Sequence, residues 1–132
     1  MKIVNFSSGS KGNTTYIETK NAKILIDMGN NCKYVVNCLE QININPKDID
    51  GIIITHIHKD HVAGLNVFLK KYNTKVYLSL PMLDGLPFIK NYELIDKDDI
   101  QTARKLLKEL EQNVAGGDPE LTRMEALISF ME

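Results

Sequence analysis

The chain has few cysteines and histidines and no tryptophan. It contains no tryptophan, two cysteines and three histidines among its 132 residues. Two cysteines cannot build the disulfide framework of a small secreted domain, so we expect Cys32 and Cys38 to stay reduced. No apolar run approaches the roughly 18 residues that a membrane span needs, and the first residues lack the pattern of a secretory signal. We therefore expect a cytoplasmic protein that does not use a membrane.

The sequence also lacks an overall excess of either charge. Sixteen basic and seventeen acidic residues give a net charge of -1. This balance excludes nonspecific binding of nucleic acid through an overall positive charge. The length suits one domain with a hydrophobic core and is too short for two ordinary domains. The charge is unevenly distributed, because residues 1–95 hold 11 basic and 8 acidic residues whereas 96–132 hold 5 and 9. We place a boundary between these two segments.

The first segment, 1–95, shows alternating strand and helix patterns. Runs rich in apolar and β-branched residues predict strands at 2–6, 14–19, 23–27, 52–54 and 76–78. Residues 20–22 predict a hairpin turn between the second and third runs. Apolar residues at helical spacing predict helices at 31–41 and 62–71.

The second segment, 96–132, carries the pattern of two amphipathic helices. The first spans 98–112 and has one apolar face, made of Ile100, Ala103, Leu106, Leu107 and Leu110. Gly116 and Gly117 end it, and Asp118 followed by Pro119 begins the next helix, over 118–131. We predict an acidic helical tail that packs on the sheet of the first segment.

The three histidines form the most informative feature of the sequence. His56, His58 and His61 fall within six positions, directly after the apolar run 52–54, and Asp60 lies among them. Two-residue spacing in an extended backbone places His56 and His58 on the same side, where they could share a metal ion. Imidazole and carboxylate ligands suit zinc, manganese or iron. The competing interpretation is a solvated loop in which the histidines are scattered.

This arrangement resembles a known family signature. His56-x-His58-x-Asp60-His61 behind an apolar strand resembles the motif of the metallo-β-lactamase superfamily. The loop at 7–13, the segment 24–29 and Asp50-Gly51 agree with it. Within the superfamily the chain most resembles the bacterial branch of WalJ (YycJ)-like and ribonuclease Z-like phosphodiesterases and nucleases. The resemblance covers about residues 1–80.

The resemblance implies a role for each matching residue. In such families the positions of His56 and His58 bind a first metal ion, and those of Asp60 and His61 bind a second. The two ions would activate water and polarise the scissile group. Asp60, as a ligand of one of them, is also the expected catalytic residue. Asp27 matches an acidic position near that site and either orients a ligand or caps the next turn. The loop at 7–13 either borders the substrate or only connects two strands.

The chain also departs from the family pattern. These families take another histidine, a bridging aspartate and a last histidine from the later half of an αββα sandwich, whereas this chain has no histidine after His61. We therefore predict an α/β fold: a truncated half-sandwich with a mainly antiparallel sheet and two C-terminal helices. Catalytic zinc usually has three protein ligands, so two per ion predict partial or absent occupancy by Zn²⁺ or Mn²⁺. The remaining acidic candidates are interpreted as turn or cap residues: Asp84, Glu93, Asp96 and Asp118.

Two functions compete. One is a metal-dependent phosphodiesterase or nuclease, acting on a nucleic acid or nucleotide, whose site is completed by another subunit or by unexpected ligands. The other is a catalytically incomplete scaffold reused as a protein-binding inhibitor or regulator. Half a sandwich leaves an apolar sheet face open, so we expect the tail helices to cover part of it and a homodimer or a protein partner to cover more. In the scaffold hypothesis the interface centres on four tail residues: Leu106, Leu110, Leu121 and Met124.

Overall fold

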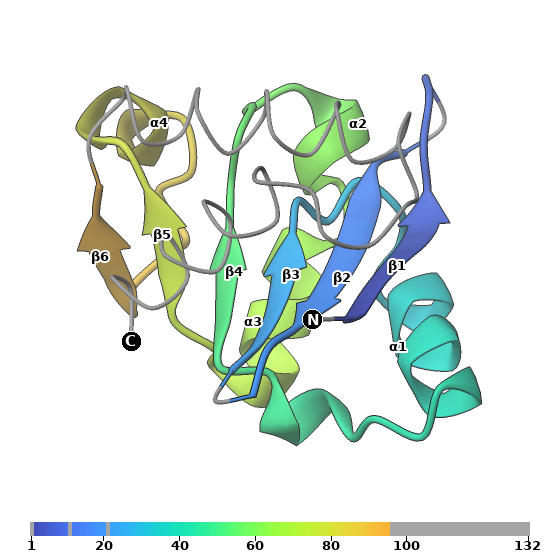
Figure 1. The fold of residues 1–132 in the computed structure, drawn as a ribbon. Coiled ribbons are helices and arrows are strands. Elements are labelled where there is room, and N and C mark those ends of the chain that lie inside the picture. The colour runs from blue at the N-terminus through green and yellow to red at the C-terminus, as the bar shows by residue number, and fades with distance from the viewer. Residues whose placement is uncertain (1, 11, 21, 96–132) are drawn as a thin grey trace, which may run out of the picture.

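A six-stranded sheet forms the centre of the molecule, with its strands arranged in sequence order (Figure 1). The computed structural model describes residues 2–95, apart from 11 and 21. The strands are β1 (Lys2–Ser7), β2 (Thr14–Glu18), β3 (Lys23–Ile26), β4 (Gly51–Ile53), β5 (Val76–Leu78) and β6 (Tyr92–Leu94). The five predicted strands are confirmed to within one residue at each end. The predicted tail helices, 98–112 and 118–131, lie outside the described residues.

The strand directions correct one prediction. The pairs β1–β2 and β2–β3 are antiparallel, and the predicted hairpin at 20–22 accounts for the second of them. The pairs β3–β4, β4–β5 and β5–β6 are parallel, so the prediction of a mainly antiparallel sheet is wrong. The reason is topological, because a helix between two strands returns the chain to the same end of the sheet. The strand patterns alone did not show this.

Helices lie in each connection between the parallel strands. They are α1 (Cys32–Gln41), the 3₁₀ helix η1 (Pro46–Asp48), α2 (Lys59–Val62), α3 (Leu65–Tyr72) and α4 (Leu80–Asp84). The prediction at 31–41 is confirmed, whereas the single helix predicted at 62–71 is two helices joined near Gly64. Neither α4 nor β6 was predicted, because such short elements carry too little periodicity. No helix in the described ranges is long and apolar enough to cross a membrane.

The core lies mainly between the sheet and one layer of helices. On this first face, side chains of the strands pack against α1 and α3, which lie on the same side of the sheet in Figure 1. Its largest fully buried members are Tyr16, Leu25, Met28, Leu39, Ile52, Ile54, Leu65, Phe68 and Leu78. Asn31 caps α1, since its side chain accepts a hydrogen bond from the Tyr34 amide at 2.8 Å. The packing of α1 and α3 and the cap at Asn31 fix where these helices lie. They thereby position the loops that follow β3 and β4.

A separate cluster occupies the opposite face of the sheet. We call it the second-face cluster; it comprises Ile17, Ala22, Ile24, Ile26, Ile53 and Tyr77, with Ile3 and Ile95 packed against it. Its described members come from strands, from the β2–β3 turn and from the residue after β6. Within the described part of the chain, no helix residue belongs to this cluster.

The two cysteines differ in accessibility, which gives a first testable prediction. Both are free, and Cys32 is buried whereas Cys38 is half-buried. Burial raises the pKa of the Cys32 thiol, although the charge of Lys71 acts in the opposite direction. We expect iodoacetamide at mildly alkaline pH to label Cys32 about tenfold more slowly than Cys38, because the thiolate is the nucleophile. Mass spectrometry of the labelled protein measures the labelling rate of each cysteine. The prediction would be contradicted if the ratio of the two rates were the same in the native protein as in urea.

Candidate metal centre

The predicted ligands gather at the edge of the sheet where β3 and β4 end. His56 and His58 lie on the segment between β4 and α2, and Asp60 and His61 lie on α2. The ring centroid of His56 is 4.4 Å from that of His58 and 5.2 Å from that of His61. Nε2 of His61 is 3.6 Å from Oδ2 of Asp60. The structure thus brings all four side chains together.

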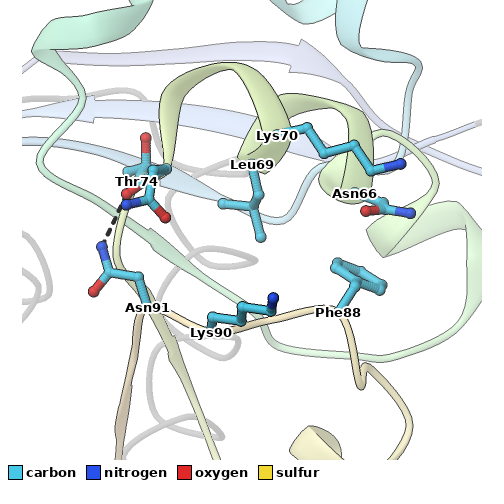
Figure 2. A pocket seen from close by; sticks show the side chains of 8 residues that line it. Asn66, Leu69, Lys70, Thr74, Phe88, Lys90 and Asn91 are labelled. Atoms are coloured by element: carbon cyan, nitrogen blue, oxygen red, sulfur yellow. Dashed lines mark hydrogen bonds between the residues drawn. The ribbon is translucent and has the colours of Figure 1, made fainter.

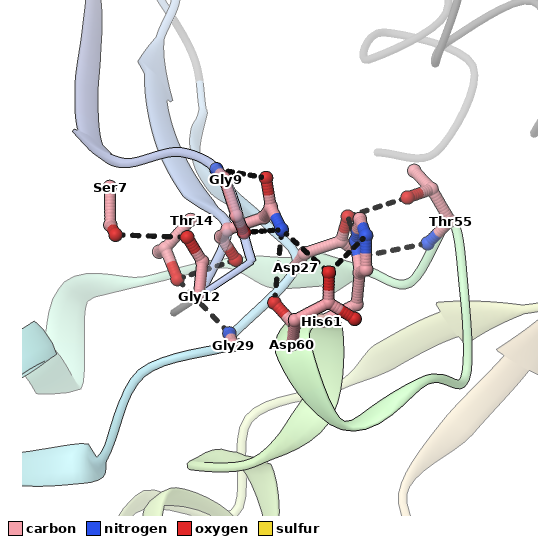
Figure 3. Close-up of polar contacts among 10 residues, drawn as sticks. Ser7, Gly9, Gly12, Thr14, Asp27, Gly29, Thr55, Asp60 and His61 are labelled. Carbon is pink, nitrogen blue, oxygen red and sulfur yellow. Dashed lines mark hydrogen bonds and ion pairs between the residues drawn. The ribbon is translucent and has the colours of Figure 1, made fainter.

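Asp27 is the polar centre beneath this cluster. It follows β3 and is 4% exposed, and its backbone has a left-handed φ of 61°. Oδ1 accepts a hydrogen bond from the Thr55 amide at 2.8 Å, and Oδ2 accepts one from the Thr55 hydroxyl at 2.5 Å. Oδ2 also lies 2.6 Å from Nδ1 of His61 (Figure 3). These contacts join Asp27 to Thr55 and to His61, one of the predicted ligands.

The contact with Asp27 determines how the His61 ring can act. The 2.6 Å contact suits the tautomer of His61 with its proton on Nδ1, because an ionised carboxylate only accepts hydrogen bonds. The proton on Nδ1 leaves Nε2, which faces Asp60, as the nitrogen with a lone pair. A carboxylate that fixes the tautomer in this way is the usual outer partner of a metal-binding histidine. Sequence analysis missed Thr55, which has no signal beyond its position after β4.

The loop at 7–13 is tied to the same cluster through Asn13. The amide N of Asn13 donates to the carbonyl of Asp60 at 2.7 Å, and Nδ2 donates to the Asp60 carboxylate at 3.2 Å. The Asn13 side chain also accepts a hydrogen bond from the Gly9 amide at 3.2 Å and donates one to the Gly9 carbonyl at 2.9 Å. The loop therefore contacts the candidate centre. Sequence analysis did not single out Asn13, whose only signal is its place in a turn-rich loop.

Two glycines allow α2 to approach the end of β3 closely. A Cβ on Gly29 would lie 1.7 Å from the carbonyl oxygen of Asp60, and one on Gly64 would lie 2.0 Å from that of Asn30. In this contact the Met28 amide donates to the carbonyl of His61 at 2.7 Å. The backbone around Gly29 thus positions both Asp60 and His61.

The donor types fit zinc or manganese, but their number is small. Imidazole and carboxylate groups are suitable ligands for these ions, and Oδ2 of Asp27 lies 2.6 Å from Nδ1 of the His61 ring. Among residues 2–95 without 11 and 21, however, no group of three or more histidine, cysteine or acidic side chains is placed to hold an ion. Glu93 instead forms a 3.8 Å ion pair with Lys75, and Asp84 ends α4. Asp96 and Asp118 lie outside the described residues.

A second hollow lies at the opposite edge of the sheet. Figure 2 shows this pocket of about 320 Å³, which is lined by Asn66, Leu69, Lys70, Asn73, Thr74, Phe88, Lys90 and Asn91. Asn91 Nδ2 donates to the Asn73 carbonyl at 2.9 Å across one side of it. None of its lining residues is a histidine, cysteine or acidic residue. This pocket therefore offers no side chain of the types that usually bind zinc.

Comparison with known proteins places this geometry in a family. The chain is 44% identical to exodeoxyribonuclease WalJ of Streptococcus pneumoniae (serotype 2, strain D39 / NCTC 7466) over 71 residues, 54% of this chain and 26% of that protein. It is 41% identical over 71 residues to exodeoxyribonuclease YycJ of Bacillus anthracis, 54% of this chain and 27% of that protein. The chain thus matches about a quarter of the length of these curated relatives.

A solved structure and a family model point to the same family as these relatives. A solved B3 metallo-β-lactamase with an active-site glutamic acid superposes with a TM-score of 0.61 at 18% identity, over 71% of this chain and 42% of that one. At this identity the likeness concerns the fold alone. The model of the metallo-β-lactamase superfamily matches residues 8–84, which include Asp27 and the whole histidine cluster. The chain belongs to the metallo-β-lactamase superfamily.

Proposed function

We propose that this chain binds Zn²⁺ or Mn²⁺ through His56, His58, Asp60 and His61 and serves in the hydrolysis of phosphodiester bonds in a nucleic acid or nucleotide. The observation that carries the proposal is the 2.6 Å contact between Asp27 and Nδ1 of His61, which turns Nε2 towards Asp60. The relatives at 41–44% identity are exodeoxyribonucleases, which supports a phosphodiester substrate. The two free thiols suit a cytoplasmic location.

Each residue has a distinct task in this proposal. When bound, the metal ions would supply an activated water molecule and polarise the scissile phosphodiester. Asp27 keeps the proton on Nδ1 of His61, and Asn13 holds the carboxylate of Asp60 by a 3.2 Å hydrogen bond. The remaining metal donors come from outside the described residues or from another subunit, since catalytic zinc usually requires three protein ligands.

A second candidate function is a protein-binding inhibitor or regulator built on a catalytically incomplete scaffold. It is favoured by the shortage of ligands, because no three metal-ligating side chains in the described ranges are placed to hold one ion. In this case the binding surface would centre on Leu106, Leu110, Leu121 and Met124 and would recruit a second copy of the chain or another protein. Histidine substitutions would then leave partner binding unchanged.

Replacement of His58 distinguishes the two functions. We expect the full chain to cleave a chromogenic phosphodiester and single-stranded DNA when Zn²⁺ or Mn²⁺ is added. His58→Ala should lower the rate about 100-fold or more, since it removes a metal ligand. Lys59→Ala is the matched control, because Lys59 is the exposed neighbour at the start of α2. Equal rates for the two variants, or no metal-dependent cleavage by the wild type, would favour the regulatory function.

A further inference from the structure

The second hollow, at the edge of the sheet away from the histidines, carries two positive charges that no acidic group balances. Lys70 on α3 and Lys90 on the segment before β6 both line it, and both are exposed. Within the described residues neither of them forms an ion pair, whereas Lys75 is paired with Glu93 at 3.8 Å. No acidic side chain lines the hollow. Its charge therefore favours an anionic ligand.

The same hollow offers an apolar surface beside the charges. Leu69 and Phe88 line it and are half-buried, because each packs partly against the core on the first face of the sheet. In Figure 2, Asn66, Leu69 and Lys70 lie on α3, and Phe88 and Lys90 lie on the segment that faces this helix. An aromatic ring next to positive charge is the combination that proteins use to bind the base and the phosphate of a nucleotide.

Backbone contacts hold the two walls of the hollow together. Nδ2 of Asn91 donates to the Asn73 carbonyl at 2.9 Å, and the Val76 amide donates to the Asn91 carbonyl at 3.0 Å. Ile89 anchors the same segment in the core and is 5% exposed. The wall before β6 is therefore fixed against the start of β5. A ligand would meet a site that is already formed, which lowers the entropic cost of binding.

We propose that the second hollow binds a nucleoside monophosphate, with Lys70 and Lys90 contacting the phosphate and Phe88 the base. The volume of about 320 Å³ lies at the lower end of the range for small-molecule sites, roughly 300–1,000 Å³. It suits one nucleotide better than a chain of them. Asn66 supplies a carboxamide that can both donate to and accept from the edge of a base. Because the histidines lie at the other edge of the sheet, this inference does not depend on the proposed metal chemistry.

Chemical-shift mapping on the full ¹⁵N-labelled chain tests where the ligand binds. The probe is adenosine 5′-monophosphate, and EDTA in the buffer removes metal ions that could hold its phosphate at the histidines. We expect saturable shifts of the amide signals of Asn66, Lys70, Phe88 and Lys90. Shifts confined to residues 56–61 would overturn the proposal, as would the absence of saturable shifts at millimolar probe.

Lysine substitutions test the contact with the phosphate. Lys70→Ala and Lys90→Ala should each weaken binding of adenosine 5′-monophosphate about tenfold, because each removes a charge-assisted hydrogen bond. Lys47→Ala is the matched control, since Lys47 is also exposed but lines a different hollow. Isothermal titration calorimetry measures the three affinities. Equal losses in all three variants would overturn the proposal, because they would indicate a general effect of charge.

Phe88→Leu tests the contact with the base. Leucine keeps an apolar side chain in the half-buried position but removes the ring. We expect about tenfold weaker binding of adenosine 5′-monophosphate and unchanged binding of ribose 5-phosphate, which has no base. An equal loss for both ligands would overturn the role of the ring. Much tighter binding of a short single-stranded oligonucleotide through the same two lysines would overturn the proposal in favour of a nucleic-acid strand.

Discussion

Asp27→Ala is expected to lower the free energy of unfolding by about 4 kcal/mol. The carboxylate is 4% exposed and contacts three donors: the amide and hydroxyl of Thr55 and Nδ1 of His61. Alanine leaves these donors without their acceptor in a buried site, and it also meets a left-handed φ of 61°. Urea denaturation followed by circular dichroism measures the loss.

Asn43→Ala is the control that isolates the backbone contribution. Asn43 has the same left-handed conformation, with φ 62°, but it is exposed. Its replacement should cost about 1 kcal/mol, the penalty of a left-handed residue with a Cβ. A loss at Asp27 no larger than that at Asn43 would show that the buried hydrogen bonds contribute little to stability.

Asp27→Asn separates the orientation of His61 from stability. Asparagine tolerates the left-handed backbone and keeps an oxygen that can accept from the Thr55 amide. Its NH₂ group, however, would face Nδ1 of His61, so the proton should move to Nε2 of the ring. We expect Zn²⁺ affinity, measured by competition with a chelating dye, to fall about 10–100-fold. The ¹⁵N chemical shifts of the imidazole report the tautomer directly, and an unchanged tautomer would contradict the positioning role of Asp27.

Gly29→Ala should reduce zinc binding more than Asp27→Asn does. The new Cβ would meet the carbonyl oxygen of Asp60 at 1.7 Å and the amide nitrogen of Asn13 at 2.4 Å. Both are backbone atoms, so the clash cannot be relieved by turning a side chain. The hydrogen bond of 2.7 Å between Asn13 and Asp60 would be lost with the close approach. We expect destabilisation of about 3 kcal/mol or more, and loss of zinc binding.

Gly85→Ala is the matched control for this substitution. A Cβ there would lie 3.0 Å from Cδ1 of Ile57, the end of a flexible side chain that is 41% exposed. The neighbour can move, so the stability should stay within about 0.5 kcal/mol of the wild type. Thermal unfolding and dye-competition assays of both variants provide the comparison. If Gly29→Ala bound zinc as tightly as Gly85→Ala, the close packing of α2 would not position the ligands.

Local sequence signals predicted most of the elements, but the hairpin turn at 20–22 was the one signal for a strand direction. The runs around Ile17, Ile24 and Ile53 identify strands because β-branched and apolar residues suit a buried sheet. Whether two strands run parallel depends on where the connection between them packs, and this information is spread over the chain. The short elements α4 and β6 were missed because three to five residues give no periodicity. The same limit hid the division of the helix near Gly64.

The candidate site shows the same division between local and long-range information. The spacing of His56, His58, Asp60 and His61 alone was enough to predict a metal-ligating cluster, since those side chains are near neighbours in the chain. Asp27 could be included only through the family resemblance, because it lies 34 positions from His61. Nothing in the sequence pattern linked Asn13 to Asp60, which are 47 positions apart.

The sequence by itself determined five of the strands and the helix at 31–41, the apolar character of the sheet, and the identity of the clustered histidines. These properties follow from side-chain chemistry and short-range periodicity, which each segment carries on its own. Only the tertiary structure decided the parallel order of β3 to β6, the hydrogen bonds from Thr55 and His61 to Asp27, and the close approach at Gly29. Those features arise where segments distant in the chain pack together, and close packing then permits only one arrangement of the backbone.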